Sequence, residues 1–442
     1  MSQPLRIAMF VGMFPVVSET FILRQIKALL DLGHEVEIFA ETRGDTTGPL
    51  HSEVAACRLL ERTTFLDLPP EAAPWELPVR PLCGRTWVPG ASAPMLNAVR
   101  LLQAIPHFCR CLAVAPRLTR KVLSRAHYGF QAESLSALFR LSSLTRRSCR
   151  FDVLHAHFGP IGSSFRFARE LWQAPLVVSF HGYDFCTKPR QQGAAIYTRL
   201  FAEAERITAN SQFTAERLQG LGCAAPKIYR LPMGLDLGKF PFRERAWPGH
   251  APVRLLTVAR LVEIKGHEFA LRAVARLAAT HDIRYDIVGD GPLRQRLEKL
   301  VAELGLQDVV VLHGARDGAF IEDLLAAAHI GVLASVNIEG DAEGQGLFLQ
   351  EAQACGLPVV ATKHGGLPEG LWPEQSGYLV SERDVEGLAD ALSRLVKQSD
   401  QWPALGRAGR AFIEQRFEIR SLTEQLVEVY RYARNAFGNV SS

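Results

Sequence analysis

The chain has 442 residues, which is too long for one ordinary hydrophobic core, so we expect two or three domains. Hydrophobic residues make up 48% and charged residues 22%, the composition of an ordinary globular protein. No apolar run approaches the roughly 18 residues that span a bilayer, and the apolar start at 6–14 reads as a buried strand rather than a signal peptide. Scattered cysteines indicate a reduced, cytoplasmic protein.

The formal charge of +4 is unevenly distributed along the chain. The segment from Leu77 to Phe151 holds twelve Lys or Arg residues and one acid, Glu133, so it carries about +11 and leaves about −7 for the rest. One basic patch on a slightly acidic protein is therefore expected.

The first half of the chain alternates between strand and helix patterns. A strand at 6–14 is followed by a helix at 19–32, with Ser18 in a position to cap it and Gly33 after its end. Residues 43–94 read as loops and short pieces, and 95–147 show helical periodicity. Further strands are expected at 34–41, 151–158, 175–182, 205–210 and 227–236.

A second alternation follows the Pro- and Trp-containing linker at 240–252. Its expected strands lie at 253–260, 285–292, 309–315, 330–335 and 358–362, and two helical segments broken near Phe417 end the chain. We therefore predict an α/β protein with two doubly wound halves and a ligand cleft between them, because such sheets bind ligands at the carboxyl ends of their strands.

Two carboxylates, Glu343 and Glu351, flank the glycine-rich start of a helix near Gly346. The free N–H groups of Gly346, Leu347 and Phe348 at that helix end would bind an anion such as a diphosphate. Carboxylates on either side could accept bonds from sugar hydroxyls. A first-turn dipole partner and a solvated helix residue are the alternative interpretation.

Arg260 and Lys265 lie in the loop after the strand at 253–260, at the same sheet edge as the helix start. A guanidinium fork and an ammonium point charge together suit a diphosphate. Two ordinary surface cations would give the same spacing in isolation, but the nearby anion-binding helix end favours a site.

Three histidines end neighbouring strands of the first half. His181 is expected to face the cleft, while His155 and His157 form an H-x-H pair without a third ligand at a recognisable spacing, so we expect no metal. The GDG at 289–291 lacks the third glycine of a dinucleotide fingerprint and reads as a tight turn.

The ordered motifs VAR…KG, EGQGLFLQE, AQACGLPVVAT and GGLPE closely resemble the GT-B retaining glycosyltransferases of the GT4 type. MFPVVSETFI, HAHFG and FHGYD resemble the exopolysaccharide (colanic acid and amylovoran) branch of that family. The resemblance implies a GT-B fold with an acceptor-binding Rossmann-like domain at 1–236 that contains the basic insertion 77–151. It also implies a donor domain at 237–416. A C-terminal helix at 417–442 would cross back to the first domain.

The resemblance also implies roles for individual residues. Arg260 and Lys265 would hold the donor diphosphate, Glu351 the ribose hydroxyls, and Glu343 and His181 the transferred sugar. The remaining donor-binding positions it implies are Gly12 on the cleft floor, His313 and Arg316 near the base, and the N–H groups of Gly346, Leu347 and Phe348. Many relatives carry a Gly-Gly loop where this chain has Gly12 alone.

The activity implied is transfer of a hexosyl unit from a nucleoside-diphosphate sugar, a uridine derivative in preference to a guanosine derivative, with no cofactor and no metal. The acceptor would be a glycan or a polyprenyl-linked oligosaccharide. Arg110, Arg117, Arg120, Lys121 and Arg125 would then suit anionic lipid heads at the inner membrane face, with a solvated helix face as the alternative and no nucleic acid expected.

Three other functions remain open at this point. A nucleotide-sugar epimerase of the same fold would turn over a donor without an acceptor. A non-catalytic sugar-nucleotide binding protein would show no transfer, and a dinucleotide-dependent oxidoreductase would bind NAD.

Overall fold

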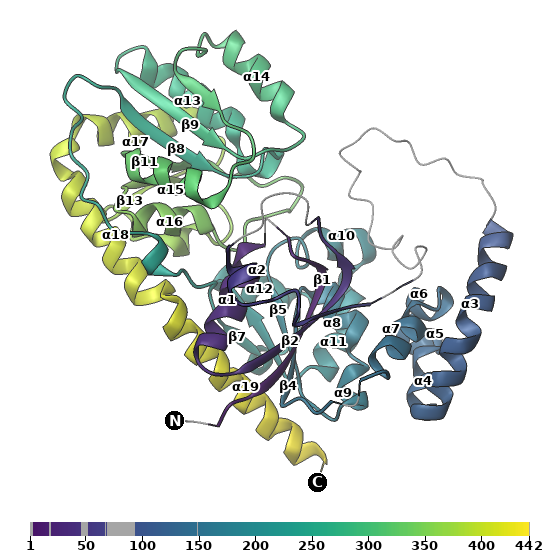
Figure 1. Ribbon diagram of the computed structural model, residues 1–442. Coiled ribbons are helices and arrows are strands. Elements are labelled where there is room, and N and C mark those ends of the chain that lie inside the picture. The colour runs from purple at the N-terminus through teal and green to yellow at the C-terminus, as the bar shows by residue number, and fades with distance from the viewer. Residues whose placement is uncertain are drawn as a thin grey trace.

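The computed structural model describes residues 3–16, 19–45, 52–66, 68, 93–147 and 149–441. Two parallel sheets organise these residues, and helices cover both faces of each sheet (Figure 1). The first sheet has seven strands and the second has six, which confirms the predicted pair of Rossmann-like units. We call the parts that carry them the N-terminal half (β1–β7) and the C-terminal half (β8–β13).

The first sheet has the strand order β3-β2-β1-β4-β5-β6-β7, so the order reverses between β1 and β4. Its strands are Arg6–Phe14 (β1), Glu35–Arg43 (β2), Thr63–Phe65 (β3), Val153–His157 (β4), Leu176–Phe180 (β5), Arg206–Ala209 (β6) and Ile228–Arg230 (β7). The helices around it are Thr20–Asp31 (α1), Ser52–Ala56 (α2), Gly159–Phe165 (α8), Ala168–Leu171 (α9), Thr187–Gln192 (α10), Thr198–Glu203 (α11) and Gln212–Gly220 (α12), with 3-10 turns Ala194–Tyr197 (η3), Ala225–Lys227 (η4) and Leu237–Lys239 (η5). The expected cap Ser18 lies outside the described residues.

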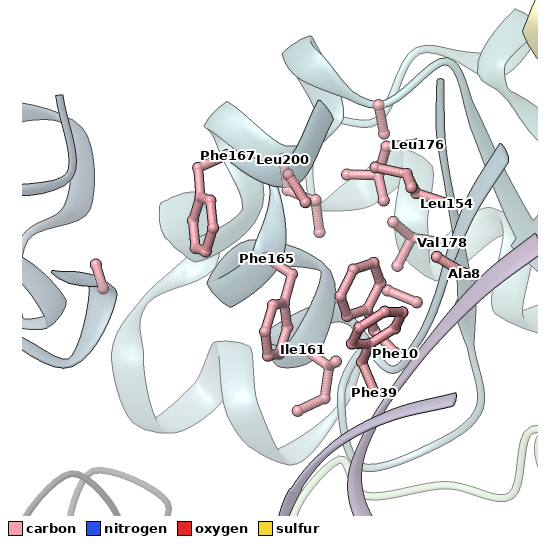
Figure 2. Packing of buried hydrophobic residues seen from close by; sticks show 14 of the residues in the cluster. Ala8, Phe10, Phe39, Leu154, Ile161, Phe165, Phe167, Leu176, Val178 and Leu200 are labelled. Carbon is pink, nitrogen blue, oxygen red and sulfur yellow. The ribbon is translucent and has the colours of Figure 1, made fainter. Parts of the chain in front are cut away.

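Aromatic side chains fill the core on one face of this sheet. Phe10 of β1 stacks on Phe165 of α8 with 4.6 Å between ring centroids, and Phe39 of β2 lies beside Phe10 at 5.4 Å (Figure 2). All three rings are fully buried. The continuous apolar run of β1 is thus explained by burial of both faces of the strand.

The second sheet has the order β10-β9-β8-β11-β12-β13. Its strands are Val253–Val258 (β8), Ile283–Val288 (β9), Val310–Leu312 (β10), Ile330–Leu333 (β11), Val359–Thr362 (β12) and Gly377–Val380 (β13). Its helices are His267–Ala278 (α13), Arg294–Glu303 (α14), Gly318–Ala327 (α15), Leu347–Ala354 (α16) and Val385–Lys397 (α17), with 3-10 turns Glu263–Lys265 (η6), Leu367–Gly370 (η7) and Ser399–Gln401 (η8).

Two long helices end the chain, Trp402–Phe417 (α18) and Ile419–Ser441 (α19). They form the yellow band that runs from the C-terminal half down the side of the N-terminal half (Figure 1). Leu426 and Tyr430 of α19 are buried in the core cluster that contains β1 and α1. The last helix therefore crosses back onto the first sheet.

Five helices form an insertion between β3 and β4, and they account for the described part of the basic segment. They are Ala93–Val114 (α3), Pro116–Val122 (α4), Arg125–Tyr128 (α5), Phe130–Glu133 (α6) and Ser136–Leu144 (α7). Residues 77–92 of the segment lie outside the described residues. Arg100 and Arg140 are buried, so these two cations belong to the core and not to the surface patch. Arg140 donates to Glu41 at 2.6 Å, which neutralises the buried guanidinium.

No helix in the described part of the chain is both long enough and apolar enough to cross a bilayer.

Candidate functional site

Lys265 and Glu343 meet at the carboxyl edge of the second sheet. The Lys265 Nζ lies 2.5 Å from Oε1 of Glu343, and the Ser335 hydroxyl donates to the same oxygen at 3.3 Å. Both charged side chains are less than one-fifth exposed. The structure thus joins the cation expected to hold a diphosphate to the carboxylate expected to hold a sugar.

Glycines hold the Lys265 loop close to the sheet. Gly266 has φ +63°, and a Cβ there would lie 1.9 Å from the Ala334 carbonyl oxygen, so a side chain is excluded. Gly289, in the GDG sequence, has φ +139°, and its Cβ would lie 2.0 Å from the Ala259 oxygen. The GDG sequence therefore supports the loop after β8 by close packing, in addition to turning the chain.

Arg260 lies at the exposed end of the same loop. Its carbonyl oxygen accepts a hydrogen bond from Nε2 of the buried His267 at 2.9 Å, and burial lowers the pKa of His267 to about 4. Its guanidinium makes no ion pair with the residues that the structure describes. The backbone of Arg260 is fixed while its charge remains available for an anion.

Helix α16 begins at Leu347, next to the start predicted near Gly346, so the N–H groups of Gly346, Leu347 and Phe348 lie at its first turn. Close packing requires glycine at two positions at this helix start, 344 and 346. A Cβ at Gly344 would lie 2.4 Å from the His181 carbonyl oxygen, and one at Gly346 would lie 2.5 Å from Leu367. Gly344 therefore lets the two halves touch, and Gly346 lets the helix end pack on leucine.

Glu351 lies in the second turn of α16 and pairs with the N-terminal half. Its Oε1 is 2.9 Å from Nη2 of Arg24 on α1, and both side chains are nearly nine-tenths buried. The guanidinium also lies over the Phe240 ring. The solvated-helix interpretation of Glu351 is therefore wrong.

His181 follows β5 and faces the C-terminal half through its contact with Gly344. Its imidazole Nε2 lies 3.0 Å from Nδ1 of His157 and packs against Phe21 and Phe158. Burial lowers the pKa of His181 to about 3, so the ring is neutral at pH 7. Its Nδ1 is buried without a hydrogen-bond partner among the described residues.

Asp184 fixes the backbone of the His181 loop. Its carboxylate accepts hydrogen bonds from the amides of His181, Gly182 and Gly159, between 2.9 and 3.1 Å. Burial raises the pKa of Asp184 to about 6. Asn210 donates to the His181 carbonyl at 3.1 Å from the other side. The FHGYD motif by itself did not indicate this role of its aspartate.

His155 is enclosed by the protein. Its two ring nitrogens bond to Tyr430 of α19 and Ser179 of β5, each at 2.7 Å, and burial lowers its pKa to about 3. It ties the crossing helix to the first sheet. Within the described residues, no group of three or more His, Cys, Asp or Glu side chains is placed to hold a metal ion.

The remaining predicted positions lie at strand ends of both halves. His313 follows β10, and its Nε2 contacts Asp286 at 2.7 Å, so its imidazole is engaged with the sheet. Arg316 is exposed and donates to the His313 carbonyl at 3.0 Å. Gly12 is half-buried in β1, and a Cβ there would only touch Ile161.

Two residues beside the site were not indicated by the sequence patterns. They are Arg24, which pairs with Glu351, and His364, whose ring accepts a hydrogen bond from the Glu343 amide.

Comparison with known proteins identifies the family. Residues 18–234 match the model of the glycosyl transferase 4-like domain, and residues 252–398 match that of the glycosyl transferases group 1. The chain belongs to the group 1, GT4-like glycosyltransferases. It is therefore a glycosyltransferase, with two matched domains that correspond to the two sheets.

The relatives cover nearly the whole of this glycosyltransferase. The putative colanic acid biosynthesis glycosyltransferase WcaL of Salmonella typhimurium is 31% identical over 432 residues, which are 96% of this chain and 99% of the relative. The amylovoran biosynthesis glycosyltransferase AmsK of Erwinia amylovora is 32% identical over 431 residues, with the same coverage.

A solved structure, Anabaena HepE in complex with UDP-glucose, superposes with a TM-score of 0.67 at 17% identity and covers 96% of this chain and 99% of that one. It supports the GT-B fold.

Proposed function

We propose that this glycosyltransferase moves a hexosyl unit from a nucleoside-diphosphate sugar to a glycan or lipid-linked oligosaccharide in extracellular polysaccharide biosynthesis, with retention of anomeric configuration. The observation that carries the proposal is the Lys265–Glu343 ion pair at the sheet edge of one half, next in sequence to Gly344, which lies against the His181 carbonyl of the other half. The names of WcaL and AmsK support the extracellular polysaccharide as product.

The charges of the site suit a diphosphate leaving group. Lys265, Arg260 and the N-terminus of α16 would neutralise the charge that develops on the departing nucleoside diphosphate. Such a leaving group needs no general acid, which agrees with a neutral His181 that can only hydrogen-bond. We infer same-face attack in which the departing phosphate accepts the acceptor proton, and we assign no covalent nucleophile to Glu343.

The donor base is proposed from the solved relatives. HepE was crystallised with UDP and with UDP-glucose, which supports a uridine donor. Glu351 would bind the ribose hydroxyls once its ion pair with Arg24 is broken. The segment from His313 to Arg316 would lie beside the base. No metal or other cofactor is included in this proposal.

A panel of UDP- and GDP-sugars, each with and without lipid-linked oligosaccharide, tests the proposal. Transfer that requires both a UDP-sugar and an acceptor, with an α-product from an α-donor by NMR, is the expected result. Donor epimerisation without acceptor would favour the epimerase. Donor binding without either reaction would favour a binding protein.

We also propose that α3 docks on an anionic membrane. Leu101, Ile105, Phe108 and Leu112 recur at helical spacing and are all exposed, with Leu102 two-thirds exposed beside them. The exposed cations Arg110, Arg117 and Arg120 lie on or just after this helix, which favours anionic lipid heads as the partner. Lys121 instead pairs with Glu170. In Figure 1, α3 stands at the outer edge of the N-terminal half.

A further inference from the structure

The backbone of Glu343 is held on both sides by the turn that follows β12. Its amide donates to Nε2 of His364 at 3.1 Å, and its carbonyl accepts from the Gly366 amide at 2.9 Å. A Cβ at Gly365, which has φ +51°, would lie 2.3 Å from the same carbonyl oxygen, so a side chain there would displace Glu343. Residues 364–366 therefore hold both backbone polar groups of Glu343.

These contacts determine where the His364 ring carries its proton. A backbone amide can only donate, so Nε2 accepts and has no proton. The proton of the neutral ring is then on Nδ1, which donates to Oε1 of Glu382 at 2.8 Å. The ring is 1% exposed, so both bonds are shielded from water. The carboxylate of Glu382 therefore sets the tautomer that allows His364 to hold Glu343.

Glu382, which follows β13, also holds the other end of the segment that carries Glu343. Its second oxygen, Oε2, accepts from the Asn337 amide at 2.6 Å. One carboxylate thus binds the start of segment 337–343 directly and the end of that segment through His364.

This segment is a tight hairpin that reaches the N-terminal half. An antiparallel bridge joins Ile338 to Asp341. The two residues between them, Glu339 and Gly340, have φ +50° and +86°, as the central residues of a type I′ turn do. The Glu339 carbonyl accepts a hydrogen bond from Arg190 of α10. The hairpin is therefore fixed at its base by one carboxylate and at its tip by the other half of the protein.

The Glu343 side chain depends on this backbone for its position. Its Oε1 contacts Lys265 and Ser335, whereas the bonds to the turn after β12 use only its backbone. A change in the turn would therefore move the carboxylate along the sheet edge. Arg260 and the N-terminus of α16, which are assigned to the diphosphate, would stay in place.

We propose that His364 and Glu382 are positioning residues for Glu343, which place its carboxylate against the transferred sugar; the inference rests on the sugar contact of Glu343 in the proposed function. His364 acts through the Glu343 amide, and Glu382 acts through the imidazole. A displacement of about 1 Å near reacting groups can lower a rate on the order of 100-fold. Sugar recognition thus depends on the two residues, and diphosphate binding does not.

Two amide substitutions separate the two bonds of His364. A glutamine amide reaches the position of Nε2, and an asparagine amide reaches that of Nδ1, so only His364→Gln keeps an acceptor for the Glu343 amide. We expect His364→Asn and Glu382→Ala to lower kcat at least about tenfold, and His364→Gln to stay within about threefold of the wild type. Normal kcat in both His364→Asn and Glu382→Ala would overturn the inference.

Calorimetric titration with UDP and with UDP-glucose shows whether the effect acts on the sugar. In His364→Asn, UDP affinity should stay within about twofold of the wild type, while UDP-glucose affinity falls at least about fivefold. With Glu343 already replaced by alanine, His364→Asn should change neither affinity, since no carboxylate is left to position. Equal losses of UDP and UDP-glucose affinity in both His364 variants would show a merely structural role and overturn the inference.

His329 supplies the matched control at the opposite edge of the same sheet. Its Nδ1 also accepts a backbone amide, that of Arg254, at 2.9 Å. His329→Gln removes that acceptor and should leave kcat and both affinities unchanged.

Nitrogen-15 NMR spectra of histidine-labelled protein report the tautomer directly. The His364 signals, identified by their absence in His364→Asn, should show a proton on Nδ1 and none on Nε2. A ring protonated on Nε2 would overturn the inference, because it could not accept from the Glu343 amide. If no donor and acceptor give transfer but His364→Asn weakens UDP-glucose and not UDP, the proposed function fails while the positioning role stands.

Discussion

Arg24 in the N-terminal half and Glu351 in the C-terminal half form an ion pair across the molecule, with 2.9 Å between Nη2 and Oε1. If Glu351 holds the donor ribose, it must exchange the guanidinium for sugar hydroxyls. The pair therefore competes with the donor.

Replacement of Arg24 by alanine should consequently tighten UDP binding. We expect an increase of several-fold or more, because the pair that the donor must displace is nearly nine-tenths buried and its removal leaves the Glu351 carboxylate without a partner. Calorimetric titration with UDP measures it, and Glu351→Ala should weaken the same affinity. Weaker UDP binding by the Arg24 variant would mean that Arg24 contacts the donor itself.

Gly344 is the point at which any side chain would separate the two halves. A Cβ there would lie 2.4 Å from the His181 oxygen and 2.8 Å from Nδ2 of Asn210. We expect Gly344→Ala to lower kcat at least about 100-fold, because a displacement of 1 Å between reacting groups has that effect. Donor turnover assays measure it.

Gly318→Ala is the control for that substitution. Gly318 also belongs to the C-terminal half, and a Cβ there would meet nothing within 4 Å. Its activity should equal that of the wild type. Full activity of the Gly344 variant would show that the contact between the halves is not needed in the reaction.

Arg260 and Lys265 should differ in what their loss does to folding. Arg260 is exposed, so Arg260→Ala should change the free energy of unfolding by less than about 0.5 kcal/mol but weaken UDP binding at least about tenfold, as loss of a charged hydrogen bond does. Lys265→Ala should lower both the free energy of unfolding and the affinity for UDP. The substitution removes the ion-pair partner of the Glu343 carboxylate, which is less than one-fifth exposed.

Urea unfolding and UDP titration separate these two effects. Lys299→Ala, an exposed cation on α14, is the control and should change neither quantity. An Arg260 variant that binds UDP normally would place the diphosphate elsewhere.

Local sequence patterns predicted those parts of the candidate site whose positions follow from the strand ends of a single sheet. Lys265 follows β8 and Glu343 precedes α16, so the rule that parallel strands end at one edge explains their contact. The contact of Arg24 with Glu351 depends on how two halves meet across 327 positions of sequence, and no local pattern carries that information.

The insertion shows a second limit of sequence reasoning. Arg140 is one of the twelve cations counted in the expected basic patch, but it is fully buried, because Glu41, 99 positions away, neutralises it. Conversely, leucines of α3 that follow a core-like spacing are exposed. Periodicity identifies the face of a helix but does not say whether protein or another partner covers it.

Leu102→Glu and Ile105→Glu should reduce binding of the protein to anionic vesicles at least about tenfold, because an apolar side chain that enters a bilayer contributes roughly 1.5 to 3 kcal/mol. Sedimentation with vesicles of phosphatidylglycerol and phosphatidylcholine measures it. Gln103→Glu adds the same charge on the same helix and is the control. Equal binding to neutral and anionic vesicles would contradict the role of the arginines, and unchanged binding of the Leu102 variant would contradict insertion of α3.

Buried neutral histidines should make the fold sensitive to acid. Burial lowers the pKa of His155 and His181 to about 3 and of His267 to about 4, whereas an unfolded histidine titrates near 6.5. Between these values only the unfolded chain takes up the proton. Each histidine therefore lowers the free energy of unfolding by roughly 1.4 kcal/mol per pH unit as the pH falls below 6.5.

Three carboxyl groups oppose this trend, because burial also raises the pKa of Asp341 above its usual range. Burial raises the pKa of Asp184 to about 6 and that of Glu19 to about 7, so the folded chain takes up these protons first and gains stability as the pH falls. Urea unfolding from pH 7.5 to 4.5 should still show a net loss, because burial lowers the pKa of seven histidines of the described residues and raises that of three carboxyl groups. His267→Gln should reduce the fall of the free energy of unfolding per pH unit below pH 6.5 by the amount that one proton contributes. This holds whatever the substitution does to stability at pH 7.5. An unchanged slope would mean that His267 is already protonated in the folded protein.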